Sequence, residues 1–169
     1  MPFGSSWSKR EKSQISAIFR IAFGTPSEAP SNAMKRNIDV ALVLWNPDVL
    51  QLMSLVLYRR NLASSGLEPS EGMEKIAHVI ASSGAPVVVF DLDPPYTRSA
   101  AVAKELLNRF PDRGFVMTCA DPVLAVRSAP WLAMYSIFQK PYETDEIAAT
   151  VCGMVHRTLR HVAACSFVM

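Results

Sequence analysis

Residues 87–95 read VVVFDLDPP, and this stretch decides the fold. Its four apolar residues run without interruption into Asp91, which is typical of a buried parallel strand that ends in a polar residue. In open α/β sheets, ligands and reactive groups lie at the carboxyl ends of the strands. The Pro-Pro pair that closes the stretch then imposes a rigid loop. We therefore expect Asp91 at the mouth of a sheet, with Asp93 two residues farther along.

The composition is that of a folded domain. The chain has 169 residues and half of them are hydrophobic, which suffices for a domain with a core and excludes disorder for most of the chain. Residues 1–36 carry six Lys and Arg against two Glu, a net charge of +4. Residues 37–169 carry 11 Lys and Arg against 13 Asp and Glu, a net charge of −2. A weakly acidic domain lacks the basic surface that nucleic-acid binding requires, so we expect no nucleic-acid partner.

The cysteine content and the hydropathy of the sequence indicate the cellular compartment. The three cysteines, Cys119, Cys152 and Cys165, are widely spaced and odd in number. This predicts reduced thiols rather than a disulfide framework or a zinc site. No apolar run reaches the roughly 18 residues of a membrane span. We therefore expect a cytoplasmic protein without a membrane span.

We divide the chain into three parts. Residues 1–36 form an N-terminal extension that we expect to be flexible, residues 37–162 form the folded domain, and residues 163–169 form a C-terminal tail. The extension contains a short amphipathic stretch around Ile15 and Phe19. Three interpretations of that stretch remain open: a transient helix in a tail, a helix for a partner or membrane surface, and a targeting peptide.

Strand and helix patterns alternate five times within the domain. Strands are expected at 39–44, around 67, at 86–90, at 114–118 and at 134–139. Helices are expected at 47–60, at 71–82, at 100–110, from 121 to before the proline at 130, and at 143–161. Right-handed crossovers place such helices on both faces of a parallel sheet. The fold class predicted from the pattern is α/β, with a doubly wound five-stranded parallel sheet.

Polar residues end three of the predicted strands. Asp91 ends the third strand, Thr118 ends the fourth in the sequence VMTCA, and Lys140-Pro141 follows the fifth in FQKPYETDEI. In this order, and with 22 residues from Thr118 to Lys140, these landmarks make the chain resemble a response-regulator receiver (CheY-like) domain of two-component signalling. The resemblance covers residues 36–160. It implies the flavodoxin-like strand order 2-1-3-4-5.

The resemblance also implies a phosphoryl-transfer site. Asp91 would accept a phosphoryl group from a histidine kinase, Lys140 would pair with one phosphoryl oxygen, and Thr118 would donate its hydroxyl to another. Mg²⁺ would neutralise the carboxylate and the phosphoryl oxygens. Asp93 occupies the position whose backbone carbonyl ligates that metal in the family.

The chain departs from the family where the metal should bind. In the family the first strand ends in an acidic pair that binds Mg²⁺, and alignment on the Asn46-Pro47 turn places Leu44 and Trp45 there. Neither side chain offers the oxygen that a hard cation requires. Asn46 could offer one amide oxygen, and Trp45 could fill the pocket.

A second departure concerns the aromatic residue three positions before Lys140. The family has Tyr or Phe there, as a ring that rotates inward on activation, whereas this chain has Ile137. Phe138 comes one position later, which places its ring on the opposite face of the strand.

These departures favour a degenerate, stand-alone receiver-like domain that acts by protein–protein interaction, is not an enzyme and binds no cofactor. Asp91 and Lys140 would then pair with each other. The alternative is a functional Mg²⁺-dependent phosphoacceptor at Asp91, serving as a phosphorelay shuttle or regulator. A third alternative, a small flavodoxin-like enzyme or cofactor binder, lacks a Gly-rich phosphate loop and a nucleophile–base pair.

The resemblance also suggests the partners. We expect a histidine kinase or another signalling protein to dock on the face that receivers build from their fourth helix, fifth strand and fifth helix. A second copy of the chain could use the last helices of the same face to form a homodimer.

Overall fold

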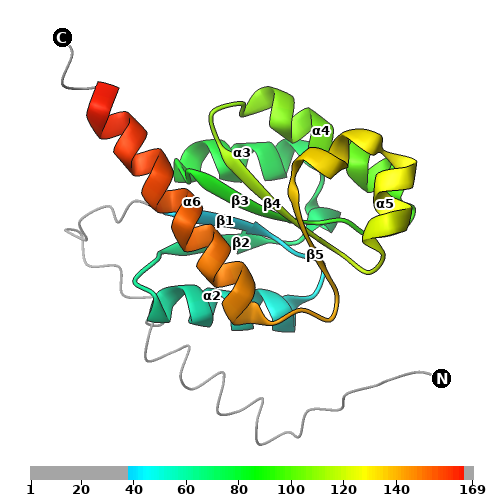
Figure 1. The fold of residues 1–169 in the computed structure, drawn as a ribbon, viewed down its shortest axis with the longest axis horizontal. Coiled ribbons are helices and arrows are strands. Elements are labelled where there is room, and N and C mark those ends of the chain that lie inside the picture. Colours follow the sequence, from blue (N-terminus) through cyan, green and yellow to red (C-terminus); the bar gives the residue numbers. More distant parts are fainter. Residues whose placement is uncertain (1–37, 166–169) are drawn as a thin grey trace, which may run out of the picture. The chain divides into compact units, whose positions relative to one another are not determined.

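The computed structural model of the chain describes residues 38–165, with side chains through Thr158. The expected extension over residues 1–36 lies outside the described residues, as do the last four residues of the expected tail. Figure 1 shows that the described part is a sheet with helices on both faces. Within this part, no helix combines the length and the apolar character that crossing a membrane requires.

Five parallel strands form the sheet. Their order is β2-β1-β3-β4-β5, which confirms the predicted fold class and strand order. The strands are β1 (Val40–Val43), β2 (Ser64–Leu67), β3 (Val87–Asp91), β4 (Gly114–Cys119) and β5 (Ser136–Gln139).

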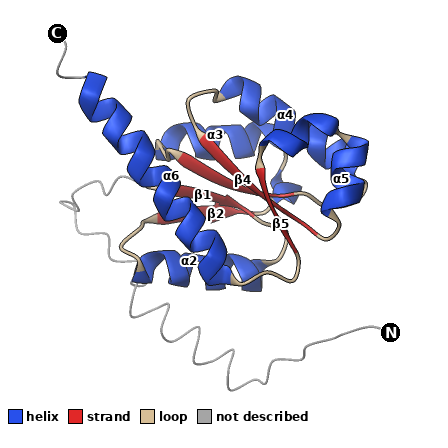
Figure 2. Ribbon diagram, viewed as in Figure 1, coloured by secondary structure: helices blue, strands red, loops and turns tan. Residues whose placement is uncertain are grey.

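Helices cover the two faces of this sheet unequally (Figure 2). One face is covered by α2 (Pro47–Arg59) and α6 (Thr144–Cys165). The other is covered by α3 (Met73–Ser83), α4 (Tyr96–Arg109) and α5 (Pro122–Ser128). Two short 3₁₀ helices complete the described elements, η1 (Pro69–Glu71) and η2 (Pro130–Met134).

The central strand β3 supplies both cores, because successive residues of a strand point to opposite faces. Val87 and Val89 pack into the core beneath α2 and α6. Val88 and Phe90 pack into the core beneath α3, α4 and α5. All five residues of β3, including Asp91, are buried, as an unbroken apolar run in a parallel sheet predicts.

Two helices extend four residues beyond one of their predicted bounds. Helix α4 begins at Tyr96, directly after Pro95, rather than at Ala100. Its first turn is held in place because the buried Tyr96 hydroxyl accepts a hydrogen bond from the backbone N–H of Asp121, at 3.0 Å. Helix α6 continues to Cys165, four residues beyond the predicted end at His161.

The fifth strand is also shorter than predicted. The sequence suggested a strand from Met134, but residues 130–134 form the 3₁₀ helix η2 and the strand begins at Ser136. Proline fits the first turn of a helix, and Pro130 lies there in η2.

Two leucines of α2 offer a matched test of this packing. Leu57 is fully buried beneath the sheet, whereas Leu52 on the same helix is 44% exposed. Leu57→Ala should lower the free energy of unfolding by about 2–5 kcal/mol, because it leaves a cavity in the core. Leu52→Ala should change it by less than about 0.5 kcal/mol. Chemical denaturation of both variants measures the difference, and equal losses would show that α2 packs through another face.

Candidate functional site

Asp91, Thr118 and Lys140 meet at the carboxyl ends of three adjacent strands. Asp91 lies opposite Thr118 in the register of β3 and β4, and Thr118 lies opposite Phe138 in the register of β4 and β5. Lys140 follows Phe138 by two residues and so returns to the same face of the sheet. Val89 and Phe138, which lie two residues before Asp91 and Lys140, pack beneath α2 and α6, so the three polar residues belong to that face.

Two hydrogen bonds join the three side chains through the Asp91 carboxylate, and we call this set the closed network because both carboxylate oxygens have a donor. Lys140 Nζ donates to Asp91 Oδ2 at 2.6 Å, and Thr118 Oγ1 donates to Asp91 Oδ1 at 2.8 Å. Asp91 is 2% exposed and Thr118 is fully buried, whereas the Lys140 side chain keeps 33% of its area in contact with solvent. A buried carboxylate must be paired and hydrogen-bonded, and here both of its oxygens have a donor.

Backbone hydrogen bonds fix the strand ends that carry this network. The N–H of Leu92 donates to the carbonyl of Thr118 at 2.8 Å, and the N–H of Lys140 donates to the carbonyl of Cys119 at 2.7 Å. The chain is therefore held on both sides of the network, by the link from β3 to β4 and by the link from β4 to Lys140.

Tyr142 is a site residue that the sequence did not single out. It is half-buried against the core beneath α2 and α6. Burial, and to a smaller extent the nearby Asp91 carboxylate, raise the pKa of its phenol, and a hydrogen bond with Thr118 opposes the rise, so that the pKa is about 12. Tyr142 follows Lys140 by two residues, and this short spacing is the feature of the sequence that could have identified it as a site residue.

The end of the first strand offers no ligand to a metal ion. Leu44 is 1% exposed and directly follows Val43, which lies opposite Phe90 in the register of β1 and β3. Trp45 is 40% exposed, so a large part of its ring faces solvent, and its expected role in filling the pocket stays a prediction.

Asn46 does not supply the missing oxygen either. Its Oδ1 accepts the backbone N–H of Asp48 at 2.9 Å and that of Val49 at 3.3 Å, as the N-cap of α2. This confirms the predicted cap. The amide oxygen of Asn46 therefore accepts hydrogen bonds from the first turn of α2 and does not face a metal site.

The residues present do not fit Mg²⁺. The metal would need several oxygen ligands, but Leu44 and Trp45 add no side-chain oxygen. Each Asp91 oxygen already accepts a hydrogen bond, from Lys140 or from Thr118. The Asp93 side chain is exposed to solvent beyond the end of β3, and the role of its backbone carbonyl as a metal ligand stays a prediction. Within residues 38–165, no cluster of three or more His, Cys, Asp or Glu could hold a metal ion.

The fifth strand has its two apolar side chains on opposite faces. Ile137 packs against the core beneath α3, α4 and α5, and Phe138 packs against the core beneath α2 and α6. The predicted orientation of Phe138 is therefore confirmed. Its ring lies on the same side of the sheet as the Asp91 network.

Cys119, which follows Thr118, is a buried thiol. Burial raises its pKa to about 11, although the nearby Lys140 ammonium favours the thiolate. A thiol with a raised pKa is a poor nucleophile, so Cys119 serves as a small core residue.

Comparison with known proteins identifies the fold. No family model and no curated protein matches the sequence. A CheY-like response-regulator receiver domain protein from Methanospirillum hungatei matches the structure with a TM-score of 0.61 and 9% identity, over 73% of this chain and 98% of that one. A two-component transcriptional regulator from Clostridium phytofermentans matches with a TM-score of 0.59 and 12% identity, over 75% and 98%. The receiver domain of nitrogen regulatory protein C matches with a TM-score of 0.58 and 20% identity, over 73% and 98%. The chain therefore has the receiver fold that its motifs predicted.

Removing Lys140 and removing Asp91 should have unequal effects. Lys140→Met leaves a buried carboxylate without its cation and should lower the free energy of unfolding by about 2 kcal/mol. Asp91→Asn should cost less, because the Lys140 ammonium can still reach water. The double variant should be no less stable than Lys140→Met alone.

A double-mutant cycle measured by chemical denaturation gives the coupling between the two residues. The Arg60–Asp145 ion pair, 2.9 Å long and exposed, is the matched control and should show a smaller coupling. Equal couplings for the two pairs would contradict a buried, closed network at Asp91.

Tyr142 should make stability depend on alkaline pH. Its folded-state pKa is raised from 10.0 to about 12, so the folded protein holds the phenolic proton more tightly than the unfolded chain does. The stability that this proton contributes is complete below pH 10 and is lost as the pH rises through about 12. The midpoint of thermal unfolding should therefore fall more steeply over this range in wild type than in Tyr142→Phe. Groups common to both proteins cancel in the comparison, and parallel curves would show that the phenol is exposed.

Proposed function

We propose that this chain is a receiver-like domain of two-component signalling that acts by protein–protein interaction and not by accepting a phosphoryl group. The observation that carries the proposal is the closed network at Asp91. The carboxylate that would be the nucleophile is buried, and each of its oxygens accepts a hydrogen bond, from Lys140 or from Thr118.

Charge balance supports this function. A phosphoryl group would bring a charge of about −1.5 to −2 into a buried site. The cation that touches Asp91 is Lys140, whose charge already balances that of the carboxylate. Since Leu44 and Trp45 cannot hold a divalent cation, the added negative charge would lack a counter-charge at this edge of the sheet.

The receiver fold supports a proposal for the partners. A histidine kinase or another signalling protein would dock on the face made by α5, β5 and α6, and the work would take place in the cytoplasm. A homodimer through the same face stays a prediction. The domain would need no cofactor and catalyse no reaction.

The retained set of Asp91, Thr118 and Lys140 favours one alternative, a Mg²⁺-dependent phosphoacceptor that serves as a shuttle or regulator. For Asp91 to react, Lys140 and Thr118 would first have to release its oxygens. The metal would have to bind without the acidic pair.

Intact mass spectrometry separates the two functions. The protein is incubated with Mg²⁺ and acetyl phosphate, with Asp91→Asn treated in parallel. We expect the same mass before and after treatment for both proteins, because the carboxylate is buried and paired, and no metal-binding cluster among residues 38–165 would balance the added charge. A phosphate-sized gain in wild type alone would overturn the proposal and establish the phosphoacceptor.

A further inference from the structure

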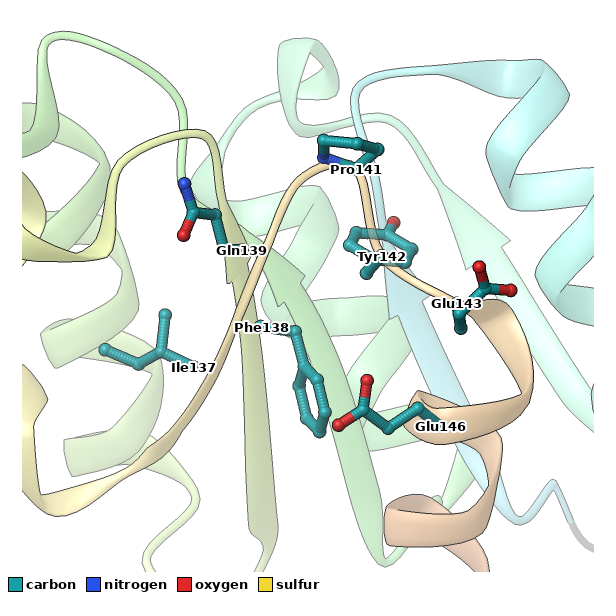
Figure 3. A pocket seen from close by; sticks show the side chains of 7 residues that line it. All are labelled: Ile137, Phe138, Gln139, Pro141, Tyr142, Glu143 and Glu146. Carbon is teal, nitrogen blue, oxygen red and sulfur yellow. The ribbon is translucent and has the colours of Figure 1, made fainter.

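A shallow groove of about 460 Å³ runs along the outer edge of the sheet, beside β5. Figure 3 shows the side chains that line it, on the strand itself and on the loop and first turn of α6 that follow. The lining residues are Ile137, Phe138, Gln139, Pro141, Tyr142, Glu143 and Glu146.

The backbone of β5 is open along this groove. Within the described sheet, β5 is the last strand and pairs with β4 alone. The N–H of Lys140 bonds to Cys119 of β4, so with a period of two the backbone groups of Phe138 also face β4. Those of Ile137 and Gln139 therefore face the open edge. Such an edge can accept an extended peptide as an additional strand.

The charges along the groove have one sign. Glu143 and Glu146 are both exposed, and the lining contains no Lys, Arg or His. The nearest lysine in sequence, Lys140, is held by Asp91, and Asp145 between the two glutamates pairs with Arg60. The carboxylates of Glu143 and Glu146 therefore face the groove without a cation in its lining.

The rest of the lining is largely apolar. Phe138 and Tyr142 are half-buried on the same side of β5 as the two carboxylates, so each leaves part of its side chain for a partner to cover, whereas the half-buried Ile137 points to the opposite side (Figure 3). Pro141 adds a rigid apolar wall. An apolar floor beside two carboxylates suits a segment in which apolar and cationic side chains alternate, since alternate residues of a strand point to opposite sides.

We propose that this groove binds an extended segment of a partner protein, in which Lys or Arg alternates with apolar residues, by adding it as a strand to the open edge of β5. The inference rests on the proposed function and names the chemistry of the partner: a cationic, strand-forming peptide.

The test uses the full chain and a synthetic library of acetylated, amidated hexapeptides. Apolar residues alternate in them with Lys or Arg, and in a matched library Glu replaces the basic residues. Binding is measured by fluorescence polarisation, and the site is mapped by amide chemical shifts. We expect members of the basic library alone to bind, with the largest shifts at Ile137 and Gln139. Binding should weaken as salt is raised.

Variants of the protein and of the peptide test the two parts of the proposal separately. Glu143→Gln and Glu146→Gln should each weaken binding about threefold, as expected for an exposed ion pair. Glu105→Gln, an exposed carboxylate on α4, is the control and should have no effect. A peptide that is N-methylated at the alternate amides that would face β5 cannot donate hydrogen bonds to the strand and should not bind.

Three results would overturn the inference. They are the absence of binding by every member of the basic library, equal binding by the Glu library, and shifts that map away from β5. Each would leave the phosphate-independent function standing, because that function is tested at Asp91 by intact mass. Conversely, phosphorylation of Asp91 would overturn the proposed function and leave peptide binding to be judged by its own result.

Discussion

The ion pair between Asp91 and Lys140, completed by the Thr118 hydroxyl, is the constraint on which the rest of this site depends. A carboxylate at 2% exposure is tolerable only with donors on both oxygens. Those donors come from β4 and from the residue that follows β5, so one carboxylate joins the ends of three strands. It thereby fixes the point at which the chain leaves β5 for α6, and the groove forms along that path.

The network at Asp91 has no net charge, whereas the groove beside β5 is negatively charged. At Asp91 the charges cancel inside the protein, and the apolar Leu44 adds none. At the groove the carboxylates of Glu143 and Glu146 are turned to solvent, where a partner can meet them. Tyr142 belongs to both places, since it lines the groove and its phenol lies beside Asp91 and Thr118.

Much of this structure could be predicted from the sequence, and the remainder depends on contacts between distant residues. The alternation of strands and helices predicted the parallel sheet, and polar residues at the ends of apolar runs placed Asp91, Thr118 and Lys140 at one edge of it. The strand order came from the resemblance to receiver domains. The start of α4 at Tyr96 could not be predicted, because a hydrogen bond to Asp121, 25 residues away, secures that turn. The position of Tyr142 beside Asp91 likewise depends on how the chain turns after Lys140.

The burial of Asp91 has a consequence for the dynamics of the sheet edge. A reagent in solution can reach this carboxylate only while the Lys140 and Thr118 hydrogen bonds are broken and the strand ends have separated. Local openings of this kind have their own free energy, distinct from that of global unfolding. The rate at which a carboxylate-modifying reagent labels Asp91 in the folded protein would therefore report how often the ends of β3, β4 and β5 come apart.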